Sequence, residues 1–154
     1  MSTGVALGVD LGTTWTAASI RGGAGGAANA EPLALGDHGA AMPSVVAVVD
    51  GEVVAGVRAE RAAAADPASA ARDFKRRLGD TTPIVVAGTP YGAETLTGHL
   101  LGAVVGAARS AGAEPGEVTL THPATWGPTS TQSCEQLSRP SRSRRACGRW
   151  RTPR

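Results

Sequence analysis

Residues 8–14, with the sequence GVDLGTT, bring one carboxylate, a turn glycine and two hydroxyls close together in the chain. A short apolar run precedes Asp10, so we expect this carboxylate at the end of a strand, next to a turn that begins at Gly12. The backbone amides of such a turn can converge on phosphate oxygens; Gly12 allows close approach, and Thr13 and Thr14 add hydroxyl donors. Asp10 repels phosphate but can hold a magnesium ion through water. The motif predicts a magnesium and phosphate site, although the same spacing also fits an ordinary hairpin.

Lys75 is the single lysine in a chain that contains fourteen arginines. A solvated, charged surface tolerates arginine equally well, whereas a compact ammonium is suited to reaching a phosphate or an attacking water. Lys75 is therefore a candidate catalytic residue. The alternative is that a single lysine occurs at this position by chance.

The elements that must position these groups follow from the apolar patterns. Strands at residues 5–10 and 15–20 flank the glycine turn and predict a hairpin. In residues 93–111 the apolar side chains recur with the 3.6-residue period of a helix, and a strand at residues 117–121 follows, which is an α/β alternation. Further expected elements are strands at 33–35, 44–50, 52–55 and 84–87, a helix at 57–65, and a helix or structured turn at 68–78.

Charge divides the chain into two parts that differ in character. Residues 1–128 carry eight basic and twelve acidic side chains, whereas residues 129–154 carry seven arginines and one glutamate. This last segment is rich in Ser, Arg and Pro, and its apolar residues follow neither the helical nor the strand period, so we predict a disordered tail. Because there is no long apolar run and no secretory signal, a cytoplasmic location is expected by default.

The segment GVDLGTTWTAASI, residues 8–20, resembles the first phosphate loop of the superfamily that contains actin, hexokinase and heat shock protein 70. Three later segments favour the heat shock protein 70 family, and their order and spacing agree with it. They are MPSVVAV at 42–48, DFKRRLG at 73–79 and TLTHPATW at 119–126.

The resemblance covers roughly residues 4–128 and departs from the family pattern at three positions, Phe74, His122 and Thr125. It implies an α/β fold, a partial actin-like ATPase lobe of the ribonuclease H type over residues 1–128, with a small inserted subdomain at about residues 37–90. It also implies a role in a stress-response chaperone that hydrolyses ATP, with ATP and magnesium as ligands. In the full-length family, unfolded client proteins and co-chaperones would be the partners.

The resemblance also implies roles for individual residues. Lys75 would reach the γ-phosphate and the attacking water, Asp10 would help to hold the magnesium ion, and Pro123 would relay the nucleotide state to the rest of the molecule. The phosphates would be cradled by Gly12, Thr13, Thr14 and Trp15.

The family's second glycine-rich phosphate loop has no counterpart in this sequence. We therefore expect the chain by itself to bind ATP weakly and to hydrolyse it poorly, and the composition of residues 129–154 suggests out-of-frame translation. Two other functions stay open. One is a sugar kinase of the same superfamily, which the context of Lys75 argues against. The other is a nucleic-acid-binding protein that uses its basic tail, although that tail contains no recognisable module.

Overall fold

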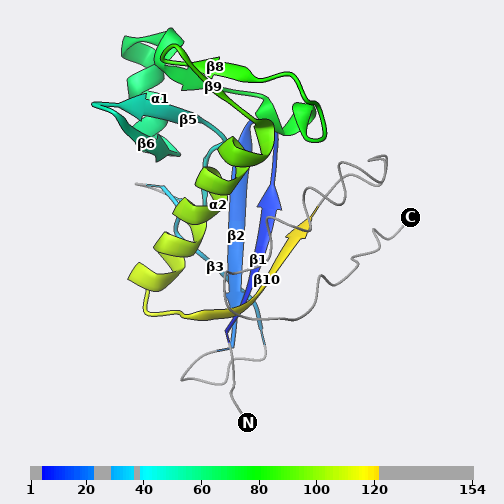
Figure 1. Cartoon of the computed structure of the whole chain (residues 1–154). Coiled ribbons are helices and arrows are strands. Elements are labelled where there is room, and N and C mark those ends of the chain that lie inside the picture. Colours follow the sequence, from blue (N-terminus) through cyan, green and yellow to red (C-terminus); the bar gives the residue numbers. More distant parts are fainter. Residues whose placement is uncertain (1–4, 23–28, 37–38, 122–154) are drawn as a thin grey trace.

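The computed structural model describes residues 5–22, 29–36 and 39–121. Its main sheet has five strands: β1 (Val5–Leu11), β2 (Trp15–Arg21), β3 (Glu31–Pro32), β4 (Ala41–Pro43) and β10 (Pro115–Thr121). The strand order is β10-β1-β2-β3 (Figure 1). Strand β4 also pairs with β2. The pairing of β1 with β10 is parallel and the other pairings are antiparallel, so the sheet is mixed.

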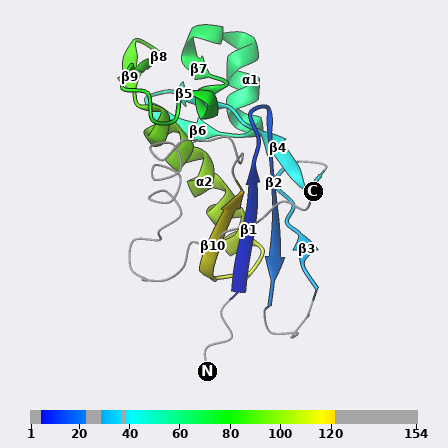
Figure 2. The same cartoon turned by 90° about the vertical axis from the view of Figure 1, so that its right-hand side faces the viewer.

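The long helix α2 (Ala93–Ser110) covers one face of this sheet (Figure 2). Side chains alternate along β1, and the apolar set that faces the helix is buried. The helix contributes residues four apart to the same cluster. Together these core residues are Val5, Leu7, Val9 and Leu11 from β1 with Leu96, Leu100, Val104 and Ala108 from α2.

The end of α2 has a local cause in the sequence. Gly112 adopts φ 80° directly after the helix, a conformation that suits glycine. The amide of Gly112 donates to the carbonyl of Arg109 at 2.9 Å, and the amide of Ala113 donates to that of Ala108 at 2.9 Å. These two bonds form a Schellman motif, which stops the helix and turns the chain towards β10.

A second, smaller sheet lies between the first hairpin and α2 in the sequence. It has the order β6-β5-β7, built from β5 (Val46–Val49), β6 (Glu52–Ala55) and β7 (Ala70–Ala71). Helix α1 (Val57–Ala65) packs its buried alanines, Ala59 and Ala63, against this sheet.

The chain then returns to α2 through short elements. Two 3₁₀ helices, η1 (Pro67–Ser69) and η2 (Phe74–Arg77), flank β7, and a hairpin of β8 (Ile84–Val86) and β9 (Thr89–Tyr91) follows. Phe74 is only 1% exposed and belongs to the main core, so it anchors η2 beside the sheet.

Most elements agree with the sequence predictions. The hairpin is confirmed with each strand one residue longer, the helix at 57–65 is confirmed, and α2 ends one residue before the predicted limit. The 68–78 segment is a structured turn with two 3₁₀ pieces rather than a helix.

The strands predicted at 33–35 and 44–50 have other bounds in the structure, and β4, β7 and β9 were not predicted. The third strand is Glu31–Pro32 instead of residues 33–35: the amide of Leu33 still donates to Ala18 of β2, but the amide of Leu35 donates to the carbonyl of Gly39 instead. The strand predicted at 44–50 begins at Val46, since Ser44 lies between two strands of different sheets.

Within residues 5–22, 29–36 and 39–121, no helix has both the length and the apolar character needed to cross a membrane. Pro123 and the predicted tail at 129–154 lie outside the described residues.

Candidate functional site

The turn between β1 and β2 has a tightly packed backbone. Asp10 is exposed near the end of β1, and Leu11 is fully buried beside it. A Cβ atom on Gly12 would lie 2.1 Å from the carbonyl oxygen of Trp15, a distance that no real Cβ contact reaches. Because the obstacle is backbone, only glycine fits at this position of the turn.

Ser44 reaches this turn from the segment between β4 and β5. Its hydroxyl donates to the carbonyl oxygen of Gly12 at 2.8 Å, and its amide donates to the carbonyl oxygen of Thr14 at 2.8 Å. The hydroxyl of Thr16 lies 2.8 Å from that of Ser44, and the two residues are 0% and 3% exposed. Two carbonyls of the turn are therefore held by one residue from outside the hairpin.

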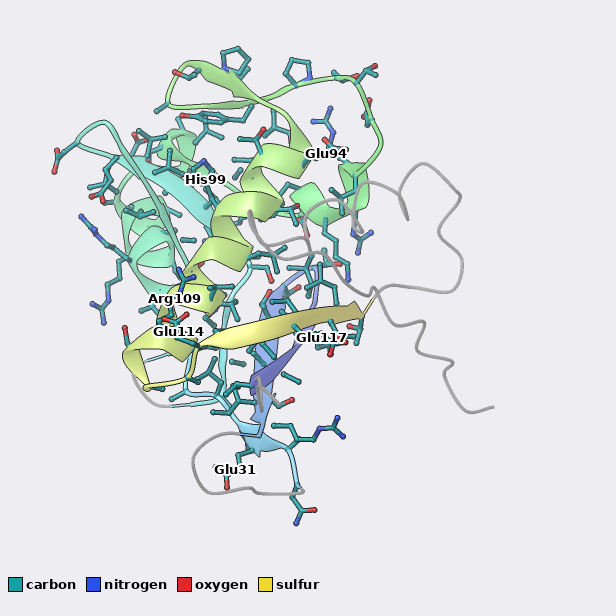
Figure 3. The ribbon with its side chains drawn as sticks, turned by 60° about the horizontal axis from the view of Figure 1, so that its bottom comes forward. Glu31, Glu94, His99, Arg109, Glu114 and Glu117 are labelled. Carbon is teal, nitrogen blue, oxygen red and sulfur yellow. The ribbon has the colours of Figure 1, made fainter. Side chains whose placement is uncertain are left out.

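Lys75 approaches the same turn from η2. Its ammonium group donates to the carbonyl oxygen of Leu11, which lies 64 positions away in the sequence. Phe74 fixes η2 in the core, and the amide of Gly79 donates to the Glu94 carboxylate at 2.8 Å. Glu94 stands in the first turn of α2 (Figure 3), so the segment that carries Lys75 is attached at both ends to the scaffold of the sheet.

These three contacts determine where the turn's amides point. In a trans peptide the N–H group is directed opposite to the carbonyl of the preceding residue, and the described chain has no cis peptide. The carbonyls of Leu11, Gly12 and Thr14 are held by Lys75 and Ser44. The amides of Gly12, Thr13 and Trp15 are therefore directed away from those donors.

Asp10 is oriented by the last residue of β10. The hydroxyl of Thr121 donates to Oδ1 of Asp10 at 2.7 Å, across the parallel pairing of β1 with β10. Among the described residues, no three His, Cys, Asp or Glu side chains come together as a metal site. A single oriented carboxylate fits magnesium, which keeps several waters and takes its remaining ligands from substrate phosphates.

The face of the sheet opposite α2 is hollowed and lies next to this carboxylate. The hollow has a volume of about 800 Å³ and is lined mainly by residues of β1, β2 and β10, including Gly8, Asp10, Ser19, Thr119 and Thr121. Thr14 and Trp15 are exposed, so the β1–β2 turn is not buried under α2, which packs on the other face of the sheet.

A comparison with known proteins adds an independent observation. No family model matches the chain. However, over 137 residues it is 34% identical to the chaperone protein DnaK of Elusimicrobium minutum (strain Pei191), and the match covers 86% of this chain. The chain is a homologue of the heat shock protein 70 family. It spans 22% of the length of that DnaK, and the homology identifies its mixed sheet and α2 as part of an actin-like ATPase lobe.

In this DnaK homologue Lys75 contacts the carbonyl of Leu11, which lies between Asp10 and Gly12 in the sequence. Thr13 is half-buried, Thr14 is exposed, and Trp15 is 59% exposed at the start of β2. The ligand-binding roles of these residues stay predictions, as does the role of Pro123.

Sequence reasoning missed three hydroxyl residues of the site. Ser44 was noticed only as part of the MPSVVAV segment, while Thr16 and Thr121 were read as ordinary strand residues. The single available signal for Ser44 was its place directly after a proline in a segment that resembles the family, and that signal assigns no partner.

Proposed function

We propose that this chain binds the phosphates of magnesium–ATP at the Leu11–Trp15 turn, as the first phosphate loop of a DnaK-type ATPase. The contact between Lys75 and the carbonyl of Leu11 carries this proposal. This contact supports the proposal because it joins the single lysine of the chain to the residue between Asp10 and Gly12, although the two partners are 64 positions apart in the sequence.

Each group at the turn has a role in this proposal. The amides of Gly12, Thr13 and Trp15 and the hydroxyls of Thr13 and Thr14 donate to phosphate oxygens. Lys75 carries three N–H donors, so its ammonium can hold Leu11 and still reach a phosphate.

The Asp10 carboxylate accepts waters of the magnesium ion, which neutralises phosphate charge when it is bound. Catalysis by such a set of groups consists of positioning and charge neutralisation.

The wider function that we propose is nucleotide-dependent chaperoning by the protein family, with unfolded polypeptides and co-chaperones as partners and the cytoplasm as the location. In this proposal Pro123, two residues after β10, relays the nucleotide state. The DnaK relative supports this reading over a sugar kinase, because that relative is a chaperone protein.

The test is a calorimetric titration of the full chain with magnesium–ATP. We expect Lys75→Ala to weaken binding at least about tenfold, since a hydrogen bond to a charged group contributes about 1.5–3 kcal/mol. Arg76→Ala is the matched control, because Arg76 is the exposed neighbour of Lys75 in η2.

Equal binding by the wild-type chain and Lys75→Ala would contradict the proposal, as would a wild-type chain that binds no nucleotide. Turnover measured in the same samples tests the expectation that this chain hydrolyses ATP slowly by itself.

A further inference from the structure

The hydroxyl of Ser44 lies at the point where the chain passes from the main sheet into the smaller one. β4, which ends at Pro43, pairs with β2, whereas β5 begins at Val46 in the three-stranded sheet. From this junction Ser44 contacts the carbonyls of both Gly12 and Thr14. We propose that Ser44, backed by Thr16, is a positioning residue that sets the direction of the turn's amides towards a phosphate. This inference rests on the proposed function for its phosphate part.

The hydrogen-bond directions follow from the number of available protons. A serine hydroxyl has one proton, and that of Ser44 is directed at the carbonyl of Gly12. The bond between the two hydroxyls must therefore be donated by Thr16 and accepted by Ser44. The result is a one-way chain from Thr16 through Ser44 to Gly12, in which each hydroxyl has a defined orientation.

Burial makes this chain of hydroxyls difficult to replace. Thr16 is 0% exposed and Ser44 is 3% exposed, so water cannot easily replace a hydrogen bond that a substitution removes. A buried polar group that loses its partner bears the full cost of desolvation. The orientation of the Ser44 hydroxyl is consequently tied to the presence of the Thr16 hydroxyl.

The peptide that joins Gly12 to Thr13 is the one that Ser44 controls through its side chain. Glycine populates a wide range of backbone angles, so neighbouring peptides can rotate unless their polar groups are held. The Ser44 hydroxyl holds the carbonyl of Gly12, and the Thr13 amide is then directed the opposite way. The bond from the Ser44 amide to Thr14 is a main-chain bond and survives substitution of the side chain.

The experiment compares Ser44→Ala, Thr16→Val and Thr16→Ser in the full chain. Thr16→Val keeps the branched shape and removes the hydroxyl, whereas Thr16→Ser keeps the hydroxyl. Ser69→Ala is the matched control, because the Ser69 hydroxyl is also buried and donates to the carbonyl of Asp66 at 2.7 Å, in η1.

Two measurements are made on each protein. The first is the NMR shift and hydrogen-exchange rate of the Thr13 amide without any ligand, and the second is the affinity for magnesium–ATP. We expect Ser44→Ala and Thr16→Val to shift the Thr13 resonance, speed its exchange and weaken magnesium–ATP binding roughly three- to tenfold. Thr16→Ser restores both measurements, and Ser69→Ala changes neither.

The outcomes separate this inference from the proposed function. An unchanged Thr13 amide in Ser44→Ala, or a Thr16→Ser variant that behaves like Thr16→Val, would overturn the positioning role. A wild-type chain without affinity for magnesium–ATP would overturn the proposed function, and with it the phosphate part, while the amide measurement still decides whether Ser44 orients the turn. An affinity loss of the same size in Ser69→Ala would also overturn the inference, because it would make the effect one of general stability.

Discussion

Two hairpin turns in this chain have opposite kinds of support. The turn between β1 and β2 is held by Ser44 and Lys75, which lie 32 and 64 positions from the carbonyls that they contact. The turn between β5 and β6 consists of Asp50 and Gly51, with φ angles of 52° and 81°. A Cβ atom on Gly51 would meet nothing within 4 Å.

The comparison shows how far the geometry of a turn is determined by the residues within that turn. Asp50 and Gly51 both favour the left-handed region, so this pair forms a tight hairpin connection without help from elsewhere. The β1–β2 turn contains Gly12 with two threonines, and its final geometry depends on donors from two other elements. A turn whose amides must bind a ligand needs a fixed direction, and distant hydrogen bonds supply that constraint.

Gly12→Ala is expected to have the largest effect, a loss of about 3 kcal/mol in the free energy of unfolding. The added Cβ would overlap the Trp15 carbonyl at 2.1 Å, so the hairpin backbone must shift. Urea denaturation monitored by circular dichroism measures the loss, and magnesium–ATP binding should disappear in the fraction that stays folded. A loss of only about 1 kcal/mol, the size expected for Gly51→Ala, would show that this turn is as adaptable as the one at Gly51.

Thr16→Val is expected to lower the free energy of unfolding by about 1–2 kcal/mol. Its shape is conserved, so the loss reports the buried hydrogen bond to Ser44 rather than packing. Urea denaturation of Thr16→Val beside Thr16→Ser checks this, because the serine variant keeps the hydroxyl. Equal losses of stability in both variants would contradict this prediction. The missing hydroxyl of Thr16→Val would then cost no more than the missing methyl group of Thr16→Ser, and the loss could not be assigned to the buried hydrogen bond.

Gly51→Ala is expected to cost about 1 kcal/mol, because alanine is strained at a φ of 81° although the site has room for a methyl group. The effect should stay local, so the affinity for magnesium–ATP should not change. Denaturation and titration of the same sample measure both quantities. Weaker nucleotide binding in this variant would mean that the two turns are coupled and that the contrast between them is false.

The sequence could predict the parts of the site whose causes are local. Apolar runs on either side of Gly12 predict the hairpin, and the helical period of residues 93–111 predicts α2, because both patterns arise within one element. The closeness of Lys75 to the turn was expected only from the resemblance to the family. The bounds of β3 could not be predicted, since Glu31–Pro32 is a strand solely through its pairing with β2. The same holds for Ser44, whose partners are fixed by the path of the chain between two sheets.

The smallest effect is expected for substitution of Asp80. Asp80 lies in a third turn, which, like the turn at Asp50 and Gly51, is held by residues close to it in the sequence. The backbone amide of Thr82 donates to its carboxylate at 2.9 Å, and Arg77 lies 3.4 Å from the other oxygen. The hydrogen bond from the Thr82 amide is the main reason that the pKa of Asp80 lies below its ordinary value of 3.8. Because the folded pKa is the lower one, the stability from this carboxylate is present above the unfolded pKa and is lost as the pH falls through the folded pKa.

A carbon-13 titration of the Asp80 carboxyl group measures this pKa directly, and urea denaturation between about pH 5 and pH 2 measures its consequence. Asp80→Asn is the control, since the amide oxygen can still accept from Thr82 but carries no charge. We expect the variant to lose slightly less stability than the wild type as the pH falls, and the difference to be small because the side chain is exposed. The Thr13 amide should not respond to Asp80→Asn. If the Thr13 amide did respond, the segment 77–82 would influence the β1–β2 turn through η2 and Lys75. The turn would then depend on this segment as well as on Ser44.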